Sequence, residues 1–222
     1  MDIWNLLIDS FPTILLAGIQ YTIPLTIISF SIALVLAILL AVVQYANIKG
    51  LKELARFYIW IIRGTPLLIQ LFVVFYGLPN VGITIDPFPA AIIVFSLNEA
   101  AYSAETIRAG LESIPVGQLE AGYCIGLTYP QILRRIILPQ ALRTSFPALS
   151  NSVISMVKDT SLVANITVAE MFMVTQRIVA RTYQPLVLYI EVGFIYLIFS
   201  TVLTKIQSVW EKQLNKKGVQ RY

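Results

Sequence analysis

The chain has 222 residues, of which 57% are hydrophobic and only 13% are charged, whereas soluble domains usually contain about 25% charged residues. One cysteine and no histidine are present, which excludes an intrachain disulfide, a cysteine-built metal site and imidazole chemistry. No Gly-x-x-x-x-Gly-Lys-Ser/Thr motif occurs to hold ATP phosphates. We therefore expect an all-α integral membrane protein with no metal site and no ATP-phosphate loop of its own.

The first apolar segment is unusually long. No charged residue occurs between Asp9 and Lys49, whereas a transmembrane helix needs about 20 apolar residues. The residues before it include Asp2 and Asp9 but no basic residue, so they lack the basic head of a signal peptide, and we expect this segment to be retained. It is long enough to tilt in the bilayer or to bend near Pro24.

Further apolar segments predict five spans in one transmembrane domain that covers residues 1–222. The predicted spans are residues 11–45, 57–78, 87–111, 143–164 and 184–208. Glycine and proline between Gly77 and Pro89 predict a short loop. A longer polar loop is expected at roughly 112–140, and residues 165–183 are expected to form a short surface helix.

An odd number of spans places the two termini on opposite sides of the membrane. If the N-terminus lies outside, most of the 16 basic residues are cytoplasmic, Arg63 and Lys158 lie within spans, and only Arg177 and Arg181 lie outside. Basic residues favour the cytoplasmic side. We therefore expect an outside N-terminus and a cytoplasmic C-terminus, and this placement explains the net charge of +4 without a nucleic-acid partner.

The polar loop between the third and fourth spans predicts two short helices joined by a glycine corner. Gln118 to Ile125 can form the first, and Gly126 suits its C-terminal end because glycine tolerates a left-handed backbone. Thr128 is expected to cap the second helix, with Gln131 three residues later as in a capping box. We predict that Leu138-Pro139 ends this second helix and returns the chain to the membrane.

This loop resembles the signature loop of the membrane subunits of ATP-binding-cassette importers: Glu-Ala-Ala, three residues, Gly, nine residues, Ile, one residue, Leu-Pro. The matching residues are Glu120, Ala121, Gly122, Gly126, Ile136, Leu138 and Pro139. Gly122 is the one departure, because the pattern has a second alanine there. The resemblance implies a type I (MetI-like) importer fold whose cytoplasmic coupling helix contacts a separate ATPase subunit. A plain amphipathic loop on the membrane surface is the alternative.

Several polar side chains fall within predicted spans, where buried ionisable groups cost at least ~2.5 kcal/mol each and usually face a cavity or a partner. The candidates for a substrate pathway are Arg63, Thr65, Asn98, Glu99, Lys158, Asp159, Thr160 and Ser161. Arg63 or Lys158 suits the carboxylate of a zwitterion. Asp159 or Glu99 suits its ammonium group, and the two hydroxyls after Asp159 supply neutral donors. The alternative is that these groups pair with one another and only hold the spans together.

The segment Arg63-Gly64-Thr65-Pro66 predicts a broken helix, because Pro66 lacks a backbone donor. Broken helices are tolerated in membranes where they line a cavity. Glu105 favours a structural role, since Arg108 lies three residues further on. Glu191 is also expected to be structural or interfacial.

Nearly the whole chain resembles the polar amino acid permease family of these importers. The resemblance rests on Arg63-Gly64-Thr65-Pro66, residues 101–108, Ile137-Leu138-Pro139-Gln140-Ala141 and Lys158-Asp159-Thr160-Ser161-Leu162. A closer likeness to cystine-type permeases rests on residues 75–79, 86–87, 96–98, 150–152 and 211–215. Glu99 departs from those permeases, where a neutral residue is usual. The resemblance implies import of L-cystine or a related polar amino acid by alternating access. It also implies that ATP and Mg are bound by the partner ATPase, so that this chain is no enzyme by itself and has no cofactor of its own.

The same resemblance implies an assembly in a bacterial plasma (inner) membrane. Its expected partners are two ATPase subunits, an extracytoplasmic amino acid binding protein and a second permease subunit, with a homodimer favoured. One alternative keeps this class but changes the cargo to glutamine, glutamate or a basic amino acid. Two others are a secondary transporter or pore, and a membrane scaffold without transport.

Overall fold

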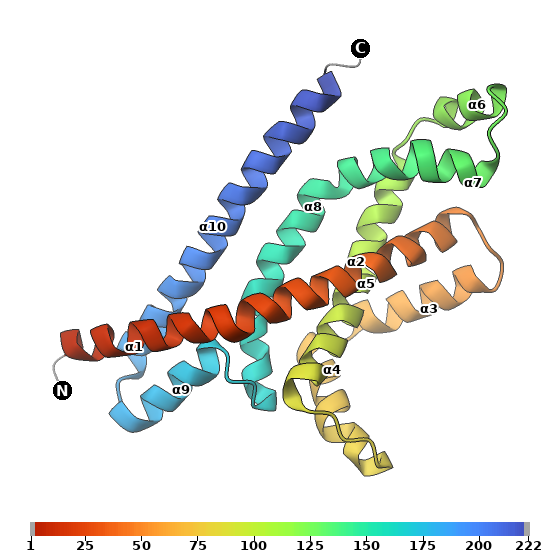
Figure 1. The fold of residues 1–222 in the computed structure, drawn as a ribbon. Coiled ribbons are helices and arrows are strands. Elements are labelled where there is room, and N and C mark those ends of the chain that lie inside the picture. Colours follow the sequence, from red (N-terminus) through yellow and green to blue (C-terminus); the bar gives the residue numbers. More distant parts are fainter. Residues whose placement is uncertain (1–2, 220–222) are drawn as a thin grey trace. The chain divides into compact units, whose positions relative to one another are not determined.

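The computed structural model describes residues 3–219, with side chains as far as Gln213. Every secondary-structure element in these residues is a helix (Figure 1). The α-helices are α1 (Ile3–Ala17), α2 (Ile23–Tyr45), α3 (Leu51–Gly64), α4 (Leu67–Phe72), α5 (Pro87–Glu112), α6 (Val116–Cys124), α7 (Tyr129–Ile132), α8 (Leu138–Asp159), α9 (Met171–Thr182) and α10 (Pro185–Val219). Three π-helical turns, η1 (Gly18–Thr22), η2 (Val73–Gly77) and η4 (Leu133–Ile137), and two 3-10 helices, η3 (Leu78–Val81) and η5 (Thr160–Ile166), lie between them.

Each of these three π-helical turns lies directly before a step into proline: Ile23-Pro24, Leu78-Pro79 and Leu138-Pro139. In each case the N–H before the proline donates to the carbonyl five residues back, as from Ile23 to Gly18 and from Leu138 to Leu133. A proline ring inside a helix clashes with the carbonyl four residues back. A wider turn moves that carbonyl away, so the chain stays helical through the proline.

This geometry corrects two sequence expectations. Leu138-Pro139 does not end the second loop helix, because η4 accommodates the proline and helical structure runs without interruption from Tyr129 to Asp159. The loop predicted from Gly77 to Pro89 is shorter than expected, since η3 extends helical structure to Val81 and α5 begins at Pro87. The first apolar segment likewise continues through Pro24 as one helical stretch from Ile3 to Tyr45.

The predicted break at Arg63-Gly64-Thr65-Pro66 is present. The α3 helix ends at Gly64, and Pro66 occupies the N-cap position of α4 with an extended backbone (φ −63°, ψ 138°). The Gln70 side chain donates to the Thr65 hydroxyl at 2.9 Å and to the Thr65 carbonyl at 3.1 Å. These bonds satisfy polar groups that the break removes from the helical ladder.

The described chain forms two compact units. The first contains residues up to 31, 65–96 and 153–206, and the second contains residues 32–64, 97–152 and those from 207 onward. One core of the first unit contains Leu25, Leu71, Phe95, Met156, Val163 and Ile166. A second core forms where α9 packs on α1 and contains Ile14, Met171, Val192 and Ile195.

In the second unit, α5 and α8 approach closely at Gly110. A Cβ atom at this position would lie 2.3 Å from the Ser145 Oγ and 2.8 Å from the Ala141 carbonyl oxygen. The Ser145 hydroxyl donates to the Thr106 carbonyl at 3.2 Å. Only glycine therefore permits this contact between the helices.

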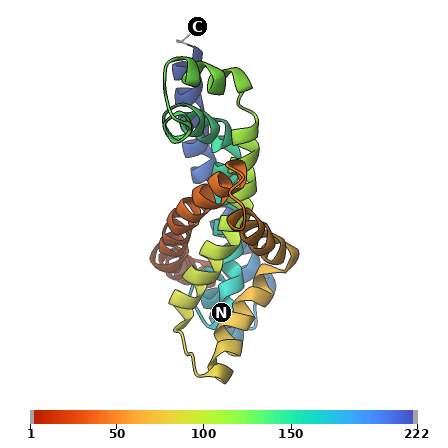
Figure 2. The ribbon, with the colours of Figure 1, turned by 90° about the vertical axis from the view of Figure 1, so that its right-hand side faces the viewer.

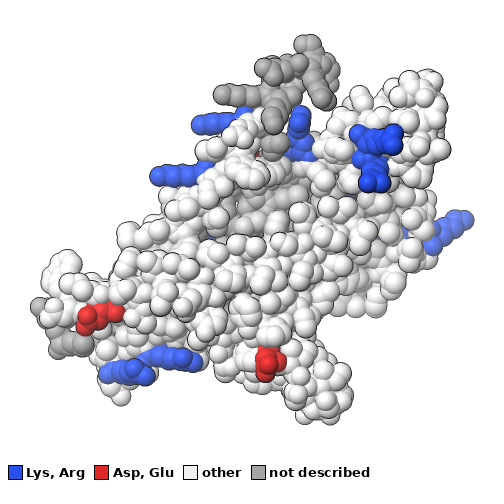
Figure 3. Space-filling view, in the orientation of Figure 1, with Lys and Arg blue, Asp and Glu red and all other residues white. Residues whose placement is uncertain are grey.

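Two helical stretches, Ile3–Tyr45 and Pro185–Gln213, are long and apolar enough to cross a membrane. Two further pairs of helices meet at a sharp bend. One pair is Leu51–Gly64 with Leu67–Val81, and the other is Tyr129–Ile166 with Met171–Thr182; if each pair counts as one broken span, the number of candidate spans rises to four. The α5 helix is not among them, because Asn98 and Glu99 lower its mean hydropathy. The predicted count of five spans therefore remains a prediction. The face drawn in Figure 3 is largely uncharged, as expected for a surface in contact with lipid.

Candidate functional site

The polar loop folds as α6 and α7, which lie side by side in both views (Figure 1 and Figure 2). The α6 helix ends at Cys124, and Gly126 follows its C-cap residue Ile125 with a left-handed φ of 80°. The Gly126 N–H donates to the Tyr123 carbonyl at 2.9 Å, and the Leu127 N–H donates to the Gly122 carbonyl at 3.1 Å. These two bonds form a Schellman motif, so the glycine corner predicted from the sequence is present.

The second loop helix begins at the predicted cap. Thr128 has an extended backbone and forms a capping box with Gln131. The Gln131 side-chain oxygen accepts from the Thr128 N–H at 2.9 Å. Partial burial raises the pKa of the Tyr129 hydroxyl, with smaller contributions from Tyr45 and Tyr123.

Gly122 of α6 is the position on which the second loop helix, α7, packs. It is buried, and a Cβ atom built on it would lie 2.6 Å from Cγ1, 2.8 Å from Cδ1 and 3.2 Å from Cγ2 of Ile132. Ile132 is itself completely buried. Ile132 therefore packs directly against Gly122, the residue that departs from the family pattern. This contact holds α6 against α7.

The outer surface of the loop carries both polar and apolar side chains. Glu120 and Ala121 are exposed, as a contact with another subunit requires. Val116, Tyr123 and Ile125 are 69%, 51% and 73% exposed. The sequence analysis did not propose these three residues as part of an interface. Their apolar side chains within a polar loop were the signal that could have identified them. Exposed apolar side chains beside an acidic residue are typical of a protein interface.

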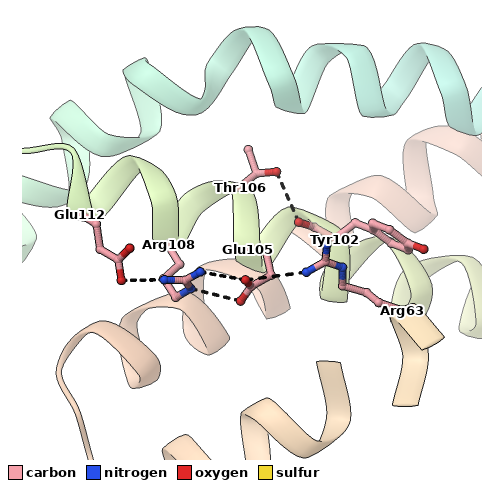
Figure 4. A network of polar contacts seen from close by, with 6 residues as sticks. All are labelled: Arg63, Tyr102, Glu105, Thr106, Arg108 and Glu112. Carbon is pink, nitrogen blue, oxygen red and sulfur yellow. Dashed lines mark hydrogen bonds and ion pairs between the residues drawn. The ribbon is translucent and has the colours of Figure 1, made fainter. Parts of the chain in front are cut away.

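Arg63 belongs to a chain of charged contacts in the second unit (Figure 4). Its Nη1 lies 3.7 Å from Glu105 Oε2, and its guanidinium stacks 5.3 Å from the ring centroid of Tyr102. Arg108 contacts Glu105 at 2.9 Å and Glu112 at 2.6 Å. Glu105 thus joins two arginines, in keeping with the structural role predicted for it.

The other candidate pathway residues divide between the two units. Asn98 and Glu99 are half-buried on α5 in the second unit, and Ser103 donates a hydrogen bond to Glu99. In the first unit, Lys158 and Asp159 are exposed at the end of α8. Thr160 and Ser161 follow in η5, where their hydroxyls donate to the carbonyls of Val157 and Lys158 at 2.7 and 2.9 Å. Thr65 lies in the same unit as Lys158.

The first unit also contains two buried carboxylates, those of Glu170 and Glu191. Glu170 is fully buried, caps α9 by accepting from the Met173 N–H at 2.9 Å, and accepts from the Tyr196 hydroxyl at 2.8 Å. Glu191 is 7% exposed and accepts from Ser10 at 2.6 Å. Sequence reasoning missed the Glu170 site, because its partner Tyr196 lies 26 residues further along the chain.

Comparison with known proteins identifies the family. Residues 33–216 match the family described as "binding-protein-dependent transport system inner membrane component". One relative is "L-cystine transport system permease protein TcyB" of Bacillus subtilis (strain 168). The chain is 50% identical to it over 214 residues, which cover 96% of this chain and 92% of the relative. Another relative is "Nopaline transport system permease protein NocM" of Agrobacterium fabrum (strain C58 / ATCC 33970). The chain is 37% identical to it over 225 residues, which cover 97% of this chain and 92% of the relative.

Solved structures share the fold. The structure titled "Crystal structure of an amino acid ABC transporter with histidines" matches with a TM-score of 0.87 and 32% identity, over 96% of this chain and 99% of that chain. An inward-facing MetNI methionine ABC transporter matches with a TM-score of 0.74 and 21% identity, over 87% of this chain and 92% of that chain, which shows the fold alone. The predicted type I importer fold is therefore confirmed, and the chain belongs to the inner-membrane components of binding-protein-dependent transport systems, the permease subunits of ATP-binding-cassette importers.

Proposed function

We propose that this permease carries L-cystine, or a closely related polar amino acid, across the membrane. The observation that supports this cargo most directly is the 50% identity to the L-cystine permease TcyB along almost the whole chain. A second L-cystine permease of the same organism, TcyL, is 40% identical over 96% of the chain. The nopaline permease supports the alternative, in which the class is the same and the cargo is a different amino acid derivative.

We assign the contact with the ATPase subunit to the exposed surface of α6 and the corner after it. Glu120 supplies a charge, and Ala121 and Ile125 supply small and apolar surface beside it. The rigid corner at Gly126 suits a loop that must transmit force without bending. This assignment places the loop in the cytoplasm, the N-terminus outside and the C-terminus inside, as the distribution of basic residues favours. The assembly then includes an extracytoplasmic binding protein and a second permease subunit, for which a homodimer is the proposed form.

We assign the passage for the cargo to Thr65 and Lys158–Ser161, which all belong to the first unit. A role of Asn98 and Glu99, which belong to the second unit, remains a prediction from the sequence. Lys158 and Asp159 are exposed and adjacent, so the pair offers both charge signs that a zwitterion requires. Arg63 already has Glu105 and Tyr102 as partners, so we assign it to the charged network instead of the passage.

The test is uptake into proteoliposomes that contain the complete assembly with its ATPase and binding protein. Radiolabelled cystine, glutamine, glutamate and arginine are compared with and without ATP. We expect ATP-dependent uptake that is fastest for cystine and is lost in Asp159→Ala. Preference for another amino acid would refute the cargo, uptake driven by an ion gradient without ATP would favour a secondary transporter, and unchanged flux in Asp159→Ala would remove this residue from the passage.

A further inference from the structure

A polar cavity of about 270 Å³ lies in the second unit, among α2, α3 and α5. Its lining residues are Gln44, Arg56, Ile59, Trp60, Arg63, Glu105 and Arg108. The cavity belongs to neither the coupling loop nor the proposed passage.

The lining carries more positive than negative charge. It contains three guanidinium groups and only one carboxylate, that of Glu105, which Arg63 and Arg108 share. Glu112, outside the lining, offsets one positive charge through its contact with Arg108.

Arg56 is the least engaged of the three arginines: among the described residues, no carboxylate lies within 4 Å of it. Glu53, one turn earlier on α3, accepts from the Gly50 N–H at 2.6 Å, and both Lys52 and Arg56 interact with its charge. A guanidinium presents five N–H donors in a planar fork. The cavity therefore retains positive charge and donors for an anionic ligand.

The helix that supplies most of the lining also presents an apolar face. Arg56, Trp60 and Arg63 follow one another at spacings of four and three residues, so they share one side of α3. Phe57, on the flank of this side, is 58% exposed, and its ring centroid lies 6.0 Å from that of Trp60. In a membrane subunit such exposed apolar side chains contact acyl chains. A ligand of this site would therefore meet positive charge and lipid at the same place.

We propose that this cavity binds the phosphate of an anionic phospholipid headgroup, with the acyl chains along Phe57 and Trp60. Arginine forms paired hydrogen bonds to phosphate oxygens, and basic pockets between transmembrane helices are typical headgroup sites. The exposed indole of Trp60 beside the arginines fits the membrane–water interface. A bound lipid would link α3 to α2 and α5. The proposal concerns the membrane itself and does not depend on the identity of the cargo.

The test is native mass spectrometry of the purified full-length chain in detergent. Dioleoyl phosphatidylglycerol and dioleoyl phosphatidylcholine are added at equal concentration, with and without millimolar inorganic phosphate or L-cystine. We expect retention of phosphatidylglycerol in preference to phosphatidylcholine. Arg56→Gln is expected to weaken this retention about fivefold, from about 1 kcal/mol per basic residue near the membrane surface.

Arg143→Gln is the matched control, because Arg143 is exposed on α8 outside the cavity and the variant loses the same charge. Equal retention of the two lipids, or equal losses in Arg56→Gln and Arg143→Gln, would overturn the proposal. Displacement of the lipid by inorganic phosphate would assign the site to a free anion, and displacement by L-cystine would assign it to the cargo's carboxylate; either result also overturns it.

Discussion

The replacement Gly122→Ala tests whether close packing of α6 on α7 shapes the coupling loop. The new Cβ would lie 2.6 Å from Ile132 Cγ1 and 2.8 Å from Cδ1, well inside normal carbon–carbon contact. Ile132 has no exposed surface into which it could move. Its Cγ1 is also close to its own backbone, so a rotation at the end of the side chain does not remove the overlap. The two loop helices must therefore separate.

The size of the effect follows from two opposing terms. Overpacking of a buried contact costs about 1–3 kcal/mol, whereas replacing glycine by alanine inside a helix gains roughly 0.5–1 kcal/mol. We expect a net destabilisation of about 1 kcal/mol. In a chain of this size such a loss lowers the unfolding midpoint by about 2–4 °C.

The assay is thermal unfolding of the purified chain in detergent, together with its affinity for the ATPase subunit. Gly117→Ala is the matched control, since Gly117 lies in the same helix and a Cβ there meets no atom within 4 Å. Ile132→Ala provides a second background, because it removes the atoms with which the new Cβ would collide. We expect Gly122→Ala to destabilise the wild-type chain and to stabilise the Ile132→Ala chain.

Two results would refute this reasoning. A Gly122→Ala chain that unfolds at or above the wild-type midpoint would mean that the loop helices yield without cost. A penalty of equal size in the Ile132→Ala background would mean that Ile132 is not the residue that excludes a larger side chain.

Three further predictions concern the loop and a buried carboxylate. Gly126→Ala is expected to cost about 1–2 kcal/mol from its left-handed backbone alone, because a Cβ there meets no atom within 4 Å; an unchanged unfolding midpoint would contradict this. Glu120→Lys is expected to leave the midpoint unchanged and to abolish ATPase binding in a pull-down, and normal binding would remove Glu120 from the contact. Tyr196→Phe is expected to cost about 1–3 kcal/mol, because the buried Glu170 loses a donor at 2.8 Å; a midpoint equal to that of the wild type would show that another donor replaces Tyr196.

Local features of this protein could be predicted well from sequence. The capping box between Thr128 and Gln131, the corner at Gly126 and the break before Pro66 each depend on atoms within about five residues of one another. Backbone geometry and short-range hydrogen bonds determine such features, so their residues specify them in any surroundings. Low charge and long apolar segments likewise identified a membrane protein without knowledge of its packing.

Prolines were harder to interpret, because their effect depends on the turn before them. Leu138-Pro139 was expected to end a helix, yet the π-helical turn η4 allows the helix to continue. A wider turn leaves no signal in the sequence that distinguishes it from a helix end.

Contacts between distant residues were decided by tertiary structure alone. The sequence left open whether Arg63 contacts a substrate or a partner side chain, and folding places it beside Glu105 on another helix. It also left Gly122 as an unexplained departure, whereas the fold brings Ile132 against it. A residue's type fixes which partners it can accept, but only packing of the helices determines which of those partners comes within reach.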